Sequence, residues 1–136
     1  MPAIDSTLFP LWLVQLLCSL LLAITFLQSG IDKVLDWKGN LGWLTGHFSK
    51  SVLRGVVPLM LVTLTVMELA SGVVSAAGVV FLLLSGSTRV ALWGTTLSAF
   101  SFVALFFGQR MAKDYAGAAG LVPYFLVSLV SLLSLR

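Results

Sequence analysis

Residues 55–88, GVVPLMLVTLTVMELASGVVSAAGVVFLLLSGST, decide the fold of this chain, because they carry a single charged side chain, Glu68. A helix needs about 20 mostly apolar residues to cross the hydrocarbon core of a bilayer. The stretch is too long for one perpendicular span and too short for two spans with a turn. We therefore expect one long, tilted or kinked membrane helix over residues 57–84, with Pro58 in its first turn, where proline is tolerated.

Three further uncharged stretches flank this one, and each is long enough for a single span. Together the four predicted spans are about residues 8–31, 57–84, 90–109 and 117–135. A cleaved signal peptide is the alternative for the first span, but Asp5 precedes it without a basic side chain, and its apolar run is too long. We therefore expect residues 1–136 to form one all-α integral membrane domain, a four-transmembrane-helix bundle.

The overall composition agrees with a membrane protein, since 59% of the 136 residues are hydrophobic and 10% are charged, with a mean hydropathy of +1.07. Soluble domains carry roughly 25% charged residues, because their surface must be wetted. This excludes a soluble enzyme, a disordered tail and a nucleic-acid-binding module. Cys18 and His47 are each the only residue of their type, so we expect no disulfide, zinc site or bis-His haem within the chain.

The link between the first two spans, residues 38–54, has the pattern of a short amphipathic helix. Asn40 can cap the start of this helix. The apolar residues that recur near helical spacing are Leu41, Leu44, Phe48 and Val52. We expect the helix to lie in the membrane interface, where Trp37 and Trp43 suit the headgroup level. The alternative is a docking site for a partner protein.

The basic residues predict the orientation of the bundle. With four spans, the first and third links lie on one side of the membrane, and their basic residues are Lys33, Lys38, Lys50, Arg54, Arg110 and Lys113. The other side carries only Arg89 and Arg136. Because cytoplasmic loops are enriched in Lys and Arg, we expect both links in the cytoplasm and both termini outside.

Glu68 is the most informative single residue, because a carboxyl group at bilayer depth is costly unless it is protonated, paired or hydrated. At 1.5 Å per residue along the second span it lies about 15–20 Å deep, near the midplane of a core about 30 Å thick. We expect Glu68 to face the bundle interior and to mark a ligand site or a proton path. The alternative is an interhelical hydrogen bond that holds the bundle together.

A second set of polar residues lies at the ends of the spans, and an up-down bundle brings these ends to one side of the membrane. The set consists of Lys33, Asp36, Gln109, Arg110, Asp114 and Tyr115. We predict Glu68 and Lys33 as the catalytic residues and the other five as ligand-binding residues. The sequence does not decide whether Lys33 extends inward to Glu68 or outward. The alternative is that these charges are ordinary anchors at the membrane interface.

Small residues fill the middle of the second span. The pairs Gly72/Ala76 and Ser71/Ser75 have the small-xxx-small spacing that allows two helices to approach closely. We therefore expect this segment to be a packing surface. Gly72 and Gly78 are also places where the helix can bend.

The residues singled out above resemble the DoxX family of small four-helix membrane proteins. Residues 26–33, FLQSGIDK, resemble the aromatic-x-x-x-Gly-x-x-Lys end of the family's first helix. Residues 68–72, ELASG, with Gly78 beyond them, resemble the Glu-x-x-x-Gly pattern of its second helix, although many relatives have Gly-Gly at 71–72. The likeness covers roughly residues 10–135. It implies a protein of the bacterial inner membrane, and some relatives are subunits of thiosulfate:quinone oxidoreductase.

The resemblance and the polar residues together predict a redox-linked membrane subunit, which binds a quinone or a small anionic or lipophilic ligand. Hydrogen-bond donors would come from Lys33, Gln109, Arg110 and Tyr115, and Glu68 and Asp114 would pass protons. The chain has no haem, flavin or metal motif, so electrons would come from a partner subunit or the substrate. The alternatives are a non-enzymatic accessory or assembly subunit of a larger membrane complex, a homo-oligomer, and a proton-coupled transporter.

Overall fold

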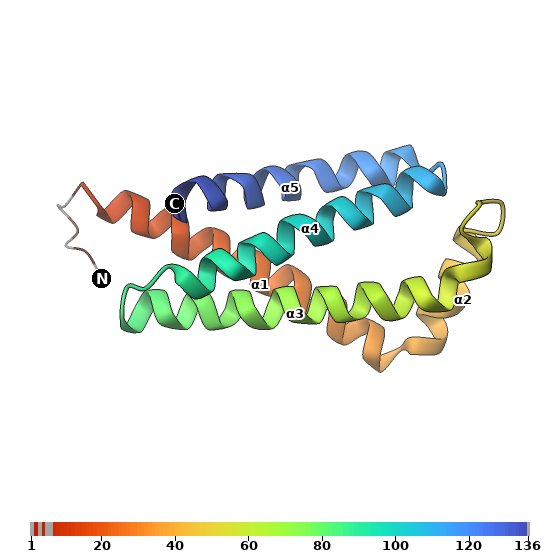
Figure 1. Ribbon diagram of the computed structural model, residues 1–136, viewed down its shortest axis with the longest axis horizontal. Coiled ribbons are helices and arrows are strands. Elements are labelled where there is room, and N and C mark those ends of the chain that lie inside the picture. Colours follow the sequence, from red (N-terminus) through yellow and green to blue (C-terminus); the bar gives the residue numbers. More distant parts are fainter. Residues whose placement is uncertain (1, 3, 5–6, 136) are drawn as a thin grey trace.

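A computed structural model of the protein describes residues 2, 4 and 7–135, so Asp5 and Arg136, which enter the arguments above, lie outside the described residues. The described chain is helical and contains no strand (Figure 1). Its elements are α1 (Phe9–Leu35), α2 (Trp37–His47), the short 3-10 helix η1 (Arg54–Val56), α3 (Val57–Leu84), α4 (Arg89–Met111) and α5 (Tyr115–Leu135). Four of them, α1, α3, α4 and α5, are long and apolar enough to cross a membrane. The predicted all-α membrane bundle is confirmed.

The spans lie where the sequence predicts them, and α1 differs most. It continues past residue 31 to Leu35, so that Lys33 lies in its last turn. At Asp36 the backbone leaves the helical region, with φ −125° and ψ 56°. Lys33 and Asp36 therefore do not share a face of one continuous helix. A charged residue such as Lys33 can extend a membrane helix when its side chain finds a partner inside the protein.

The short helix predicted between the first two spans exists as α2, but the expected cap was wrong. The helix begins at Trp37, and Asn40 lies inside it, where its side-chain amide donates to the carbonyl oxygen of Asp36 (2.8 Å). Of the predicted apolar stripe, Leu44 and Phe48 are buried and Leu41 is half-buried against them, whereas Val52 is 86% exposed. Phe48 and Val52 lie beyond the end of the helix at His47, and Leu44 and Phe48, four residues apart, attach this segment to the bundle.

The bundle has two ends that differ in packing. Both chain termini lie at one end, which we call the terminal end, and α2 lies at the other, the α2 end (Figure 1). Toward the terminal end α3 packs closely on its neighbours: a Cβ atom added to Gly78 would lie 2.6 Å from the Ala91 Cα of α4. A Cβ atom on Gly72 would lie 2.8 Å from the Leu27 backbone nitrogen of α1. The small residues of α3 are therefore points of close helix approach, as predicted.

Candidate functional site

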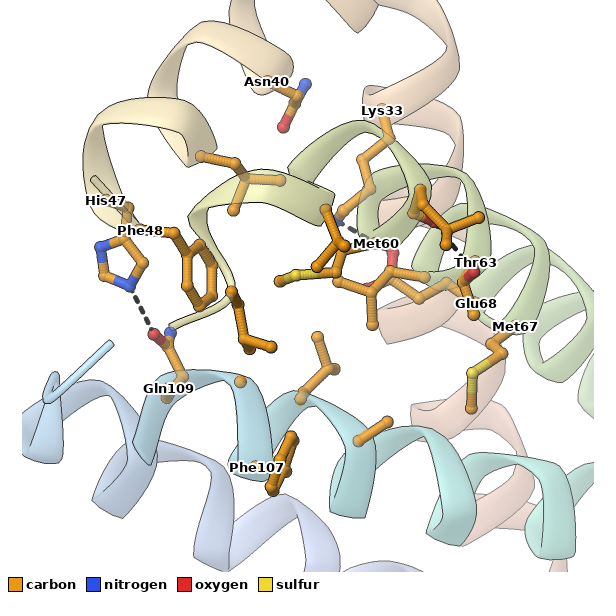
Figure 2. Close-up of a pocket in the computed structure, with 18 of the residues that line it drawn as sticks. Lys33, Asn40, His47, Phe48, Met60, Thr63, Met67, Glu68, Phe107 and Gln109 are labelled. Carbon is orange, nitrogen blue, oxygen red and sulfur yellow. Dashed lines mark hydrogen bonds and ion pairs between the residues drawn. The ribbon is translucent and has the colours of Figure 1, made fainter. Parts of the chain in front are cut away.

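A cavity of about 530 Å³ occupies the α2 end of the bundle (Figure 2). Its lining comes from the C-terminal part of α1, from α2 and the loop after it, from the first half of α3 and from the second half of α4, with one residue of α5. The walls are mainly apolar, and typical members are Leu64, Met67, Leu105 and Phe107. Polar side chains line it at a few positions: Ser29, Lys33, Asn40, His47, Thr63, Glu68 and Gln109. Ligand sites commonly have this character, with apolar walls and a few placed polar groups.

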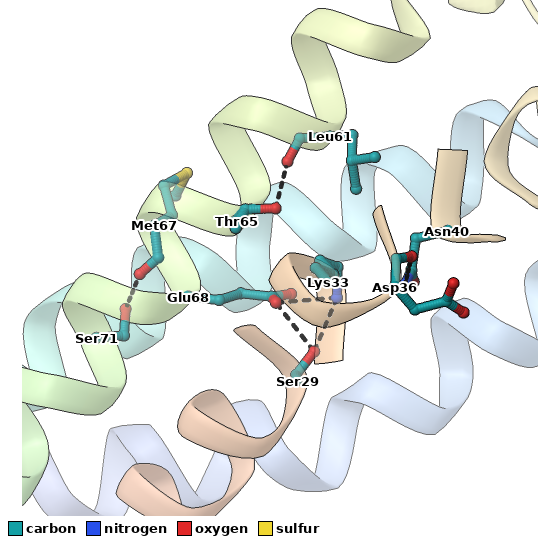
Figure 3. A network of polar contacts seen from close by, with 9 residues as sticks. All are labelled: Ser29, Lys33, Asp36, Asn40, Leu61, Thr65, Met67, Glu68 and Ser71. Atoms are coloured by element: carbon teal, nitrogen blue, oxygen red, sulfur yellow. Dashed lines mark hydrogen bonds and ion pairs between the residues drawn. The ribbon is translucent and has the colours of Figure 1, made fainter. Parts of the chain in front are cut away.

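The deepest polar group is a triangle formed by Ser29, Lys33 and Glu68 (Figure 3). The Lys33 ammonium Nζ lies 2.9 Å from the Glu68 carboxylate Oε2 and donates to the Ser29 hydroxyl at 2.8 Å. Ser29 Oγ in turn donates to Glu68 Oε2 at 2.9 Å. Glu68 is 1% exposed. The sequence left the direction of Lys33 open, and in the structure it extends inward to Glu68.

Local helix geometry explains why the triangle forms. Ser29 and Lys33 are four residues apart, so they lie above one another on one face of α1. Gly30, between them, lets α1 approach α3 closely, since a Cβ atom there would lie 2.7 Å from the Leu69 side chain. This contact brings Glu68, the neighbour of Leu69, within reach of both polar groups. A charge pair away from water is tolerated when it is paired and hydrogen-bonded, and here both conditions are met.

A second polar group centres on His47 and joins α2 to the end of α4. His47 Nε2 lies 2.8 Å from the Gln109 side-chain oxygen Oε1, and 3.8 Å from Asp114 Oδ2. The imidazole stacks on Trp43 with ring centroids 4.5 Å apart. Asp114 also accepts a hydrogen bond from the Gly117 backbone N–H (2.9 Å), so the same carboxylate caps the start of α5. His47 and Gln109 line the cavity, while Asp114 lies behind them.

The structure brings part of the predicted site together. Of the seven predicted residues, Lys33, Glu68 and Gln109 line the cavity, whereas Asp36, Arg110, Asp114 and Tyr115 lie at the same end of the bundle but outside the lining. Arg110 lies over the ring of Tyr115, 4.5 Å from its centroid, and both residues are exposed. Asp36 is exposed as well, and its carboxylate points away from the Lys33–Glu68 pair (Figure 3).

Two residues of the site were missed by the sequence analysis, Ser29 and His47. Ser29 carries a usable signal, because it is the hydroxyl residue one helical turn before Lys33. His47 carries none, since its partners Gln109 and Asp114 are more than sixty residues away and are brought to it only by tertiary packing.

The donor set indicates what the site can bind. Among the described residues, no group of three or more His, Cys, Asp or Glu side chains could hold a metal ion. Comparisons of the chain with protein-family models, with curated proteins and with solved structures found no match. The function is therefore argued from the site alone. An apolar cavity with an ammonium, a carboxyl, an imidazole and an amide in its wall suits an uncharged or weakly acidic lipophilic molecule that exchanges hydrogen bonds and protons.

Proposed function

We propose that this protein is a redox-linked membrane protein that binds a quinone in the cavity at the α2 end. The observation that carries the proposal is the buried Ser29–Lys33–Glu68 triangle in the wall of an otherwise apolar cavity. A quinone ring is flat and apolar and presents two carbonyl oxygens that accept hydrogen bonds. The cavity offers donors in two places, at Lys33 and at the His47–Gln109 pair.

The polar groups also match the proton balance of quinone reduction. Reducing a quinone to a quinol consumes two electrons and two protons. The electrons come from a partner redox subunit, because the chain has no redox cofactor motif of its own. The Lys33 ammonium stabilises negative charge that develops on a carbonyl oxygen. Glu68 and His47 are the groups in the cavity wall with the chemistry to pass protons to the bound ring.

The same proposal includes membership of the DoxX family, a bacterial inner-membrane location and periplasmic termini. Its support is that the residues of the resemblance meet in space: Gly30 and Gly72 are both contact points between α1 and α3, and Lys33 pairs with Glu68. The alternative role as an accessory subunit has less support. The small residues of α3 that could dock a partner face α1 and α4 of the same chain, at Gly72 and Gly78.

The proposal is tested by titrating the purified protein in lipid nanodiscs with decylubiquinone. Tryptophan fluorescence reports binding, because Trp43 lines the cavity. Lys33→Met and Glu68→Gln are each expected to weaken binding about tenfold or more, the loss expected for one hydrogen bond to a charged group. The matched controls are Lys38→Met and Asp32→Asn, which remove the same charges at exposed positions outside the cavity lining. Unchanged binding in both Lys33→Met and Glu68→Gln overturns the assignment of the site.

A further inference from the structure

The cavity is bordered differently toward the bilayer and toward the membrane surface, and the difference indicates how a ligand reaches it. We infer that the ligand enters sideways from the bilayer, between the first half of α3 and the second half of α4, and that its hydrocarbon tail remains in this opening when its head group is bound. This inference rests on the proposed function and adds to it the class of ligand, a quinone with a single long tail that is dissolved in the membrane.

The first observation is that the closest contacts between α3 and α4, at glycines and hydroxyl groups, lie toward the terminal end. Their close contacts run from Gly78–Ala91 through Ser75–Gly94 to the hydroxyl pair Ser71–Ser101, whose oxygens are 3.0 Å apart. Beyond Ser101, toward the α2 end, residues of both helices line the cavity. The facing side chains there line the cavity, and they are Met60, Leu64 and Met67 of α3 with Ala104, Leu105 and Phe107 of α4.

The second observation is the chemistry of the opening on this side, which we call the portal. Its rim consists of Leu59 and Thr63 on α3 and Phe107 on α4, all of which line the cavity and are also exposed. Leu59 is 66% exposed and Phe107 is 55% exposed. Both residues lie in helices that span the membrane, so the rim faces lipid rather than water. An apolar rim on a lipid-facing surface admits a hydrocarbon tail and no charged group.

The third observation is that α2 and the loop after it lie across the end of the cavity that points toward the membrane surface. This segment contacts the end of α4 at successive positions: His47 bonds to Gln109, Phe48 packs beside Gly108, and the Ser51 hydroxyl donates to the Met111 carbonyl (3.1 Å). The buried face of α2, Leu44 and Phe48, packs at the same time against the start of α3. The segment therefore bridges α3 and α4 above the cavity.

The ion pair lies on the side of the cavity opposite the portal. The Lys33–Glu68 pair belongs to α1 and to the face of α3 that packs on α1, across the cavity from Phe107 (Figure 2). A molecule that enters by the portal meets apolar side chains first and the ion pair last. An amphiphile with a polar head and one tail fits this order, with the head at Lys33 and the tail between Leu59 and Phe107.

The experiment compares two quinones in nanodiscs, decylubiquinone and the same ring with a methyl group in place of the decyl tail, with concentrations expressed per lipid. Thr63→Phe narrows the portal, and Val62→Phe is the matched control, because Val62 is exposed on α3 next to Thr63 but outside the cavity lining. We expect Thr63→Phe to weaken decylubiquinone binding about tenfold, because the added ring overfills the opening that the tail has to occupy. The tail-less ring should bind equally well to the wild type and to both variants.

The outcomes separate this inference from the proposed function. Equal binding of decylubiquinone by Thr63→Phe, Val62→Phe and the wild type overturns the portal, while the quinone site at Lys33 and Glu68 stands. An equal loss of both quinones in Thr63→Phe also overturns it, because the substitution then acts on the head-group site. If the wild type binds neither quinone, the proposed function fails and the inference fails with it.

Discussion

At the terminal end of the bundle α3 and α4 touch backbone to backbone, whereas at the α2 end the same two helices are separated by a cavity of about 530 Å³. The difference follows from side-chain size. Gly78, Ser75 and Gly94 allow the two backbones to approach closely, while the larger Met67, Leu105 and Phe107 line the cavity. One pair of helices thus provides both a rigid contact and a binding cavity, because small and large residues are segregated along its length.

The two ends also differ in the kind of polar group that is buried and in what it bonds to. Toward the terminal end most are hydroxyl groups, such as the Thr95–Ser131 pair (2.9 Å), beside the Gln15 amide, which donates to the Ser134 carbonyl (2.7 Å). Ser19 Oγ and Ser75 Oγ are buried there without a hydrogen-bond partner. At the α2 end the polar groups include the ionisable Lys33, His47 and Glu68, and they line a space that a ligand can occupy. The hydroxyl groups are small enough to allow close helix packing, whereas the Lys33–Glu68 pair lines the cavity.

The largest expected effect comes from breaking the ion pair at the α2 end. Glu68→Ala leaves the Lys33 ammonium without a carboxylate and should lower the free energy of unfolding by about 3 kcal/mol, as for other buried pairs that lose one partner. Thermal unfolding in detergent, followed by circular dichroism, measures the loss. The double variant Lys33→Met/Glu68→Leu removes both charges and should recover most of the stability. A double variant as unstable as Glu68→Ala would contradict the pairing.

A smaller loss is expected from filling the close contact toward the terminal end. A Cβ atom on Gly94 would lie 2.7 Å from the Ser75 backbone nitrogen, so Gly94→Ala should separate α3 from α4 and cost about 2 kcal/mol. The same unfolding assay applies. Gly120→Ala is the control, because nothing lies within 4 Å of that position, and the better helix propensity of alanine should stabilise it by up to about 1 kcal/mol. Equal effects at both glycines would show that the contact between α3 and α4 is loose.

The smallest effect should be local to α2. His47→Ala removes the hydrogen bond to Gln109 and should cost about 1 kcal/mol. Because α2 contacts the bundle through few residues, the loss should appear as faster hydrogen–deuterium exchange in the α2 amides, with the exchange of α3 and α4 unchanged. Thr45→Ala, on the exposed side of the same helix, is the control. Unchanged exchange in His47→Ala would mean that the contact does not hold α2 over the cavity.

Much of the difference between the two ends was predictable from the sequence. The position of a residue along a span gives its depth in the membrane, and the residue type gives the size of its side chain. The uncharged stretches predicted the four spans, the small residues predicted the close contacts of α3, and the isolated Glu68 predicted a polar site inside the bundle. Each of these inferences needs only the position of a residue along its own helix.

The parts that could not be predicted depend on how each helix is rotated about its axis and on the direction in which a long side chain extends. Lys33 has a long, flexible side chain, so its position at the end of a span is compatible with an inward or an outward direction, and only the approach of α1 to α3 at Gly30 decides between them. Arg110 and Tyr115 lie at the predicted end of the bundle, but their side chains contact each other on the surface instead of lining the cavity. His47 is close to Gln109 only because α2 folds back across the end of the cavity.

The most direct test of the account is a crystal structure of the protein grown in lipid with decylubiquinone. We predict that the quinone ring lies in the cavity with a carbonyl oxygen within hydrogen-bond distance of Lys33 or Ser29, and that the decyl tail leaves between Leu59 and Phe107. A ring bound only on the outer surface of the bundle, with the Lys33–Glu68 pair and the cavity walls unchanged, would contradict the central claim that this cavity is a quinone site.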